Sequence, residues 1–128
     1  MFIKIMYCMV TVSDQEKALE FYTALGFEKR VDYPGPEGRF LTLGYKGQDI
    51  ELMLWKGNTG SKNADSASTV TDNPGILFLE SEDLRKDFDA LVSKGIKFIE
   101  ESPEDYPWGV RITALDPDGN RIALRERK

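Results

Sequence analysis

The amino-acid sequence predicts an α+β fold built from two βαβββ modules in tandem. Two observations carry this prediction. Residues 47–52 (GQDIEL) are similar to residues 119–124 (GNRIAL), and residues 14–26 are similar to residues 83–95 at nearly the same spacing along the chain. Internal repetition at a fixed spacing indicates a structural unit that is present more than once. The 128 residues are enough for one domain made of two such units.

The first module is expected at about residues 1–55. Apolar residues alternate over 3–12, as in a strand. Ser13 with Glu16 three residues later has the spacing of a capping box, so a helix should begin there, with Ser13 as its N-cap, and run to about Leu25. Gly26 then supplies the left-handed stop. The expected strands that follow lie near 27–32, 39–45 and 49–55, and the Gly- and Pro-rich segment 33–38 between the first two should be irregular.

The second module is expected at about residues 75–128, after a polar segment at 56–74. That segment is rich in Gly, Ser and Asn and lacks apolar periodicity, so we interpret it as a linker, with a functional lid as the alternative. The module itself should contain a strand at 75–80, a helix from about Ser81 to Lys94 that Gly95 ends, and strands near 96–100, 109–115 and 120–126, the last two joined by a turn at 116–119.

Composition limits the function classes. The net charge of −5 argues against a nucleic-acid-binding surface, and no apolar run approaches the roughly 20 residues that cross a membrane. The start of the chain does not have the pattern of a signal peptide, and the single cysteine, Cys8, fits a reducing compartment, so we expect a cytoplasmic protein. Histidine is absent, which excludes Ser–His and Cys–His nucleophile schemes.

Five short motifs occur in the order in which one known superfamily has them. The motifs are Val12-Ser13-Asp14, Ala18-Leu19-Glu20-Phe21-Tyr22, Leu25-Gly26-Phe27, Pro107-Trp108-Gly109-Val110-Arg111 and Asp116-Pro117-Asp118-Gly119-Asn120. On these motifs the chain resembles the vicinal oxygen chelate superfamily, which contains glyoxalase I, extradiol dioxygenases, fosfomycin-resistance enzymes and bleomycin-resistance proteins. The last two motifs are most similar to the bleomycin-resistance branch. The resemblance implies curved mixed sheets with the helices on their outer faces, and a homodimer.

The same resemblance points to a metal site and to its loss. In the enzymes of the superfamily, each module supplies one metal ligand from its first strand and one from its fourth. The matching positions here are Tyr7, Glu51, Ile76 and Ala123. Glu51 alone is a good match, because Ile76 and Ala123 have no ligand atom and Tyr7 would need an unusually acidic phenol. We therefore expect no metal and no cofactor, with Glu51 as the only retained candidate ligand.

Strand parity predicts which side chains point away from the helices. Cys8, Ile50, Leu52, Leu54, Ile122 and Leu124 should pack under the helices. The concave faces should then carry Tyr7, Met9, Thr11, Asp49, Glu51, Met53, Trp55, Ile76, Phe78, Glu80, Arg121, Ala123 and Arg125, to which Trp108 is added because that region flanks the drug groove in bleomycin-resistance proteins. Such a mostly apolar lining with few polar groups is typical of a ligand pocket, although the same side chains can fill a closed core.

Several roles stay open at the level of the sequence. Glu51 either pairs with Arg121 or Arg125 or contacts a ligand, because an unpaired carboxylate in apolar surroundings is costly. Trp55 is a pocket wall or covers a dimer seam, and Trp108 supports its turn or binds the ligand. The ligand is expected to be flat and partly apolar with a cationic group, or anionic if the arginines neutralise the carboxylates.

Three function classes are compatible with these residues. The first is a metal-free small-molecule-binding dimer with its cleft at the interface. The second is a glyoxalase- or dioxygenase-type enzyme with an atypical ligand set of Glu51, Tyr7 and water. The third is a dimeric scaffold whose cavity is filled. No catalytic residue is identifiable from the sequence.

Overall fold

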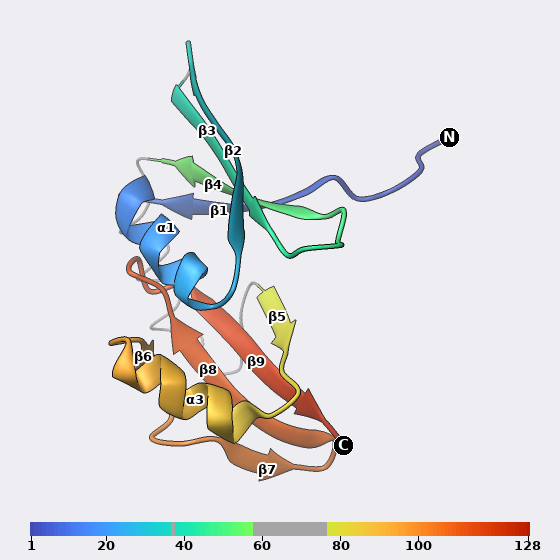
Figure 1. The fold of residues 1–128 in the computed structure, drawn as a ribbon, viewed down its shortest axis with the longest axis vertical. Coiled ribbons are helices and arrows are strands. Elements are labelled where there is room, and N and C mark those ends of the chain that lie inside the picture. The colour runs from blue at the N-terminus through green and yellow to red at the C-terminus, as the bar shows by residue number, and fades with distance from the viewer. Residues whose placement is uncertain (37, 58–76) are drawn as a thin grey trace. The chain divides into compact units, whose positions relative to one another are not determined.

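The structure, a computed structural model, describes residues 1–36, 38–57 and 77–128. The chain divides into two compact units, Met1–Gly60 and Ser61–Lys128, and each unit holds one module of the predicted α+β fold (Figure 1). The described residues form one mixed sheet of four strands and one of five. In this part of the chain, every helix is too short or too polar to span a lipid bilayer. The predicted linker falls mainly on residues 58–74, outside the described residues, while Lys56 belongs to a strand.

The first module follows the predicted order. Its elements are β1 (Tyr7–Val12), α1 (Gln15–Ala24), β2 (Glu28–Gly35), β3 (Gly38–Gly44) and β4 (Glu51–Lys56). The strands lie in the order β1-β4-β3-β2, with β1 parallel to β4 and the other pairs antiparallel. This is the connectivity of a βαβββ unit, in which α1 carries the chain across one face of the sheet.

The start of α1 differs from the expected capping box. Asp14, not Ser13, is the N-cap: its Oδ1 accepts the backbone N–H of Glu16 at 2.9 Å and of Lys17 at 3.1 Å. A carboxylate serves here as well as a hydroxyl, and its charge is also favoured by the helix dipole. Gly26 ends the helix as predicted, with a φ of 101°.

The segment 33–38 is not irregular as expected. β2 continues to Gly35, β3 begins at Gly38, and the two strands pair up to Pro34 with Arg39 and Gly35 with Gly38. β2 is the edge strand of its sheet. Proline has no N–H to donate, and on an edge strand that N–H is not needed by a further strand, so Pro34 is tolerated. The prediction of an irregular segment was therefore wrong.

The second module repeats the first with one addition. Its elements are β5 (Leu77–Glu80), α3 (Leu84–Ser93), β6 (Lys97–Phe98), β7 (Glu104–Tyr106), β8 (Gly109–Leu115) and β9 (Arg121–Arg127). The order is β5-β9-β8-β6, and the unpredicted β7 also pairs with β8. β6 and β7 together thus take the place that the single long strand β2 has in the first module.

The helix α3 begins three residues later than predicted. Three side-chain acceptors occupy its first turn: Ser81 Oγ accepts the N–H of Asp83 at 3.1 Å, Asp83 Oδ1 accepts that of Lys86 at 3.2 Å, and Glu126 Oε1 accepts that of Leu84 at 2.7 Å. Glu126 comes from β9, at the far end of the module. Because a tertiary contact satisfies the free N–H groups, the local sequence alone does not place this helix start.

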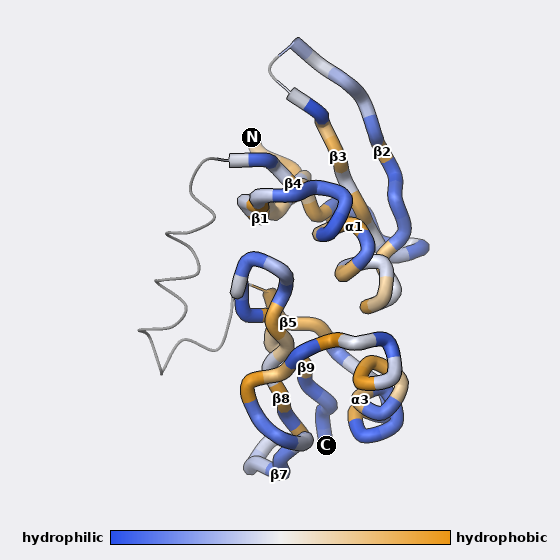
Figure 2. The backbone as a smooth tube through the Cα atoms, turned by 90° about the vertical axis from the view of Figure 1, so that its left-hand side faces the viewer, coloured by the Kyte–Doolittle hydropathy of each residue, from blue (hydrophilic) through white to orange (hydrophobic). Residues whose placement is uncertain are grey.

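Each module has its core between its helix and one face of its sheet. Parity correctly predicted that Leu52, Leu54, Ile122 and Leu124 are buried. Figure 2 shows apolar stretches along β3 and β8, the central strands that contribute to these cores. Two predictions were wrong: Cys8 is exposed, because burial along β1 begins only at Val10, and Ile50 is exposed, because it precedes β4 and has no place in the sheet.

Candidate functional site

The face of each sheet that its helix does not cover carries the residues predicted to line a cleft. In the first module, β1 and β4 bring these residues together in pairs, namely Tyr7 with Glu51, Met9 with Met53 and Thr11 with Trp55. In the second module, β5 and β9 pair Phe78 with Ala123 and Glu80 with Arg125. The repeat thus predicted the parity of the strands correctly.

A pocket of about 470 Å³ lies on the open face of the first module, and we call it the apolar pocket. Its lining residues are Met9, Tyr33, Gly35, Pro36, Gly38, Phe40, Met53 and Trp55. None of them carries a charge at neutral pH. Trp55 is among these lining residues, which agrees with a pocket wall, one of the two roles considered for it. The β2–β3 hairpin and Phe40 are lining that the sequence analysis did not include.

Four residues predicted on the open face of the first module, namely Tyr7, Thr11, Asp49 and Glu51, are not part of the apolar pocket's lining. Asp49 is exposed just before β4 and pairs with Lys4 at 3.6 Å. Glu51 is partly buried, and its carboxylate lies 3.6 Å from the guanidinium of Arg30, its partner within this module. Arg30 was not among the partners considered for Glu51, which were Arg121 and Arg125. The charge of Glu51 therefore has a partner, and the pocket beside it is uncharged.

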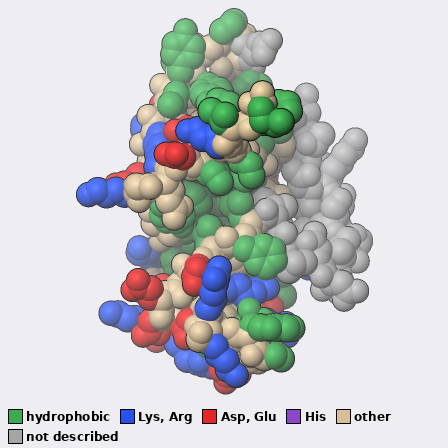
Figure 3. Space-filling view, turned by 90° about the vertical axis from the view of Figure 1, so that its right-hand side faces the viewer, with side chains coloured by type: hydrophobic (Ala, Val, Ile, Leu, Met, Phe, Trp, Pro, Cys, Tyr) green, Lys and Arg blue, Asp and Glu red, His purple; other side chains and the backbone are tan. Residues whose placement is uncertain are grey.

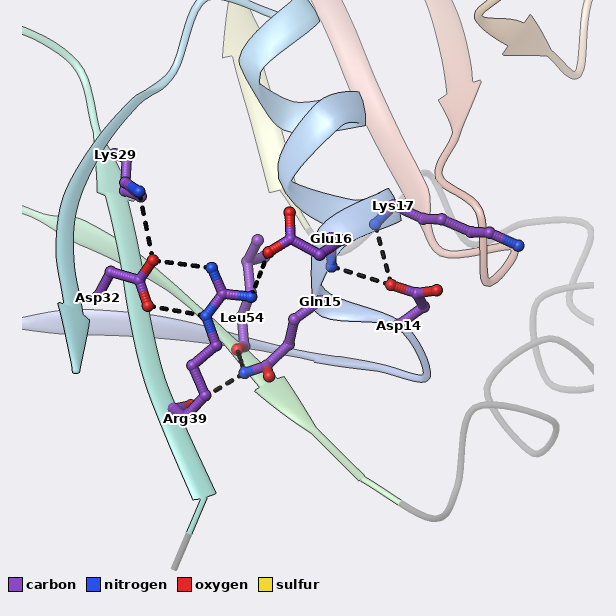
Figure 4. Close-up of polar contacts among 8 residues, drawn as sticks. All are labelled: Asp14, Gln15, Glu16, Lys17, Lys29, Asp32, Arg39 and Leu54. Carbon is purple, nitrogen blue, oxygen red and sulfur yellow. Dashed lines mark hydrogen bonds and ion pairs between the residues drawn. The ribbon is translucent and has the colours of Figure 1, made fainter. Parts of the chain in front are cut away.

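The hairpin that walls the apolar pocket is tied to α1 by a polar cluster (Figure 4). Arg39 donates to Asp32 through two bonds, at 2.7 and 2.8 Å, and to Glu16 at 2.6 Å. Gln15 Nε2 donates to the carbonyl oxygens of Arg39 and Leu54, both at 2.9 Å. The hydrogen bonds from Arg39 hold the pKa of Asp32 well below its usual range, and Asp32 in turn raises the pKa of Arg39. These bonds join α1 to β2, β3 and β4.

A second pocket, of about 640 Å³, lies on the open face of the second module, and we call it the cationic pocket. Its lining residues are Phe78, Leu79, Glu80, Tyr106, Pro107, Trp108, Arg125, Arg127 and Lys128. It brings together the predicted residues Phe78, Glu80, Trp108 and Arg125. Arg121, at the start of β9, is not part of its lining. In Figure 3, apolar side chains gather over the first module, and charged side chains are dense over the second.

Arg125, which lines the cationic pocket, is held by aromatic rings and carbonyl oxygens. Its Cζ lies 5.2 Å from the ring centre of Phe78 and 5.8 Å from that of Tyr106. Its Nη1 donates to the carbonyl of Leu124 at 3.0 Å and lies 3.5 Å from that of Ile112. A guanidinium above a ring gains cation–π stabilisation, and these contacts fix the direction of the side chain.

The β7–β8 hairpin presents Trp108 to this pocket. Trp108 is exposed and its ring stands edge-on to Tyr106, with the centroids 5.9 Å apart. Gly109 has a φ of 145°, and a Cβ there would collide with the carbonyl oxygen of Glu126 on β9. The glycine of the Pro-Trp-Gly motif therefore allows β8 and β9 to approach closely, while the tryptophan lines the pocket. The sequence analysis missed Tyr106, Arg127 and Lys128, although Pro-Trp-Gly marks the hairpin that places Tyr106.

Comparison with known families gives one match that covers nearly the whole chain. The model of the Glyoxalase/Bleomycin resistance protein/Dioxygenase superfamily matches residues 4–124. The chain belongs to this superfamily. The resemblance stated from the sequence motifs is thereby confirmed, and so is the fold of tandem βαβββ modules.

The superfamily members that are similar to this chain include an antibiotic binding protein and a probable lyase. The crystal structure of TnmS3, an antibiotic binding protein from Streptomyces sp. CB03234, matches this chain with a TM-score of 0.76 and 33% sequence identity. The match covers 99% of this chain and 98% of the TnmS3 chain. A superfamily member from Sphaerobacter thermophilus has a TM-score of 0.75 and 32% identity, with 98% of both chains covered. A probable lactoylglutathione lyase from a Synechocystis strain is 28% identical over 94% of this chain and 92% of its own length.

The metal of the superfamily's enzymes can be tested against the residues that occupy its place. Tyr7 and Glu51 lie side by side on β1 and β4. On the second module, Ala123 of β9 pairs with Phe78 of β5, and the side chains of Ala123 and Phe78 have no atom that can bind a metal. Ile76, the first-strand position that matches a metal ligand in this module, lies outside the described residues. Within residues 1–36, 38–57 and 77–128, no three His, Cys, Asp or Glu side chains are grouped to hold a metal ion. The residues on these strands therefore do not fit the divalent metal of the superfamily's enzymes.

Proposed function

We propose that this chain is a small-molecule-binding protein that works without a metal ion. One observation carries the proposal: the open sheet faces have pockets lined by aromatic side chains, but in the second module the strands that hold a metal in the enzymes carry Ala123 and Phe78, which cannot bind one. The similarity to TnmS3, which is an antibiotic binding protein, supports a natural-product antibiotic as the kind of ligand.

The size and chemistry of the pockets suit this function. Ligand pockets are commonly 300–1,000 Å³, mostly apolar, with a few polar groups that orient the ligand. The apolar pocket, of about 470 Å³, supplies Trp55, Phe40 and two methionines, and sulfur and aromatic groups adapt well to flat apolar molecules. The cationic pocket, of about 640 Å³, supplies orienting groups. Burial of apolar ligand surface stabilises a complex by roughly 25 cal/mol per Å² before the costs of association are subtracted.

The proposal includes a homodimer that completes the binding cleft. Met9 and Tyr33 are exposed on the open face of the first module, and Phe78 and Trp108 are exposed on that of the second. Exposed apolar side chains that gather on a sheet face are typical of an interaction site. A second copy that covers the open face of each module would bury these side chains and enclose a ligand. We also propose that the protein acts in the cytoplasm, which localisation of a C-terminal fluorescent fusion would test.

A second candidate is a glyoxalase-type enzyme. Tyr7 and Glu51 are adjacent on β1 and β4, and a relative carries the name probable lactoylglutathione lyase. This candidate needs a metal held by Glu51 with unusual partners. The pairing of Glu51 with Arg30 argues against it, because a guanidinium and a divalent cation compete for the same carboxylate.

The experiment that tests the proposal is a binding screen with a readout for each pocket. The chain has two tryptophans, and Trp55 lies in the apolar pocket while Trp108 lies in the cationic pocket. Bleomycin-type glycopeptides and planar aromatic antibiotics would be titrated while tryptophan fluorescence and the melting temperature are recorded. A ligand at one hundred times its Kd stabilises the fold by about 2.7 kcal/mol. Trp55→Phe and Trp108→Phe variants assign the fluorescence change to a pocket. A screen without any thermal shift, together with metal-dependent lyase activity, would favour the second candidate.

A further inference from the structure

We infer that the cationic pocket takes a planar aromatic acid, with Arg125 as the residue that selects the acid group. This inference rests on the proposed small-molecule binding and adds the chemical class of the ligand for one pocket. It reverses the expectation of a cationic ligand that Glu51, Asp49 and Glu80 suggested in the sequence.

The two pockets occupy equivalent places in the two modules. Each lies on the open face and is walled by a hairpin with a Pro-x-Gly sequence, at 36–38 in the first module and 107–109 in the second. Each also uses the first and fourth strands of its module. The fourth strand contributes Met53 and Trp55 to the apolar pocket, but Arg125 and Arg127 to the cationic pocket. The duplicated frame therefore presents two different chemistries.

The balance of charge in the cationic pocket favours an anion. Its lining has three cationic side chains, Arg125, Arg127 and Lys128, against one carboxylate, Glu80. Glu80 pairs with Arg127 at 3.3 Å. No carboxylate among the described residues forms an ion pair with Arg125, whose charge is met by two rings and by backbone carbonyl oxygens. A partly buried guanidinium without a carboxylate partner is the group that a ligand anion satisfies best.

The aromatic side chains specify the rest of the ligand. Phe78 and Tyr106 contact Arg125, and Trp108 stands edge-on to Tyr106 in the same lining. A flat ring that carries an acid group can therefore contact these rings while the acid reaches the guanidinium. The contacts to Phe78 and Tyr106 hold Arg125 in place before binding, which lowers the entropic cost of fixing its side chain. The apolar pocket rejects the same acid, because burying a charge without a partner is costly.

Three probes with the same ring and different charge test the inference. They are 2-naphthoate, the neutral 2-naphthamide and the cationic 2-naphthylmethylammonium, each titrated by calorimetry and by the two indole N–H signals of ¹⁵N-labelled protein. Trp55→Phe and Trp108→Phe assign those signals. We expect naphthoate to bind most tightly, about tenfold better than the amide, and to shift the Trp108 signal but not the Trp55 signal.

The matched variants are Arg125→Met and Arg111→Met. Arg111 also lies over Tyr106, at 5.3 Å from its ring centre, and carries the same charge, but it does not line the pocket. We expect Arg125→Met to lower the ratio of naphthoate to naphthamide affinity about tenfold, to near one, and Arg111→Met to leave it unchanged. Arg125→Lys, which keeps the charge but not the two-pronged geometry, should give an intermediate ratio. Melting curves check that all three variants fold.

Four outcomes would overturn the inference. They are tightest binding of the cationic probe, a naphthoate shift at Trp55 instead of Trp108, an affinity ratio that Arg125→Met leaves intact, and no binding of any probe at millimolar concentration. In each of these cases, antibiotic binding in the screen above would still support the proposed function. The two failures are therefore distinguishable.

Discussion

The guanidinium of Arg30 lies 3.6 Å from the carboxylate of Glu51, on the face where the superfamily's enzymes hold their metal. Arg30 Nη2 also donates to the carbonyl of Tyr45 at 2.5 Å. The guanidinium lies over Gly44, where a Cβ would be 2.5 Å from Arg30 Cζ. Because glycine has no side chain, residue 44 leaves room for Arg30 to reach Glu51. The one side chain that matches an enzyme ligand is thus engaged by a cation of the protein itself.

The pairing of Glu51 with Arg30 leads to a prediction about metal content. We expect elemental analysis of protein purified without chelators to give well under one equivalent of nickel, zinc, iron or manganese per chain, and Glu51→Gln to leave this value unchanged. The reason is that a divalent ion needs several oxygen or nitrogen ligands, and at the matching strands of the second module stand Ala123 and Phe78. Near-full occupancy that disappears in Glu51→Gln would contradict the prediction and restore the enzyme candidate.

The bond between Arg39 and Asp32 predicts a dependence of stability on acid pH. The pKa of Asp32 is lowered by its hydrogen bonds from Arg39, so the carboxylate stabilises the fold above the unfolded-state pKa of about 4 and loses this effect as pH falls through the lower folded-state value. We expect Asp32→Asn to be less stable than wild type at pH 7 in urea unfolding, and the difference to shrink steadily below pH 4.

A matched control for this prediction is the exposed pair Arg85–Asp105, 3.3 Å apart, whose side chains are mostly in solvent. Asp105→Asn should change stability by less than about 1 kcal/mol at any pH, because exposed single ion pairs contribute little. A difference between wild type and Asp32→Asn that persists undiminished at pH 2 would show that the variant acts by some route other than charge.

Tyr45 predicts the opposite dependence at alkaline pH. Burial raises the pKa of Tyr45 to about 12, and its hydroxyl donates to the carbonyl of Leu25 at 2.9 Å, at the end of α1. The unfolded chain loses this proton near pH 10, so the stability due to Tyr45 is complete below pH 10 and declines between pH 10 and 12. Tyr45→Phe should cost about 1 kcal/mol at pH 7, a deficit that shrinks above pH 10. Tyr33→Phe, at an exposed site, is the control and should show no such trend.

Two buried threonines, one on β3 and one on β8, allow a test of buried polar groups. Thr42 is fully buried, and its Oγ1 has no hydrogen-bond partner among the described residues, whereas Thr113 Oγ1 lies 3.4 Å from Glu100 Oε2. Valine has nearly the same shape and favours strands at both sites equally. We expect Thr42→Val to stabilise the fold by about 1 kcal/mol and Thr113→Val to destabilise it by a similar amount in urea unfolding. Destabilisation by Thr42→Val would mean that its hydroxyl is satisfied in solution.

The internal repeat made the order of helices and strands predictable. The alternation of side chains along each strand predicted many of the residues that lie on the open sheet faces. Both depend on local periodicity, which a single sequence carries. Arg30 shows the limit of this reasoning. A register shift between Lys29 and Val31 places Arg30 at a bulge, and a bulge arises from how β2 meets β3, which no pattern within β2 reveals. The partner of Glu51 could not be predicted for this reason.

The site of the second module shows a similar limit. The spacing before the helix predicted Ile76 as the first-strand position of the superfamily's metal site, whereas the β5 residue that pairs with Ala123 is Phe78. Tyr7, which pairs with Glu51, stands seven residues before the N-cap Asp14, whereas Phe78, which pairs with Ala123, stands five residues before the N-cap Asp83. β7, which brings Tyr106 beside Arg125, is only three residues long and is held by its pairing with β8. Such contacts depend on tertiary pairing, which the sequence pattern does not contain.

The final prediction is that the protein is a homodimer that covers the open sheet faces. Met9 in the first module is 62% exposed, and Phe78 and Trp108 in the second module are 59% and 72% exposed in the single chain. Exposed large apolar side chains on an open sheet face are typical of an interaction site. Light scattering at micromolar concentration should give about twice the chain mass of 14.5 kDa. Phe78→Arg, which places a charge on the open face, should move the mass toward that of one chain, with a dissociation constant raised at least about tenfold.

Val92→Arg is the matched control for the dimer prediction. Val92 is 49% exposed, but it lies on α3, so a dimer through the open sheet face does not bury it. We expect this variant to keep the mass of wild type. Dissociation by Val92→Arg but not by Phe78→Arg would place the interface on the helices. A wild-type protein that stays at 14.5 kDa over the whole concentration range would contradict the dimer and remove the interfacial cleft from the proposed function.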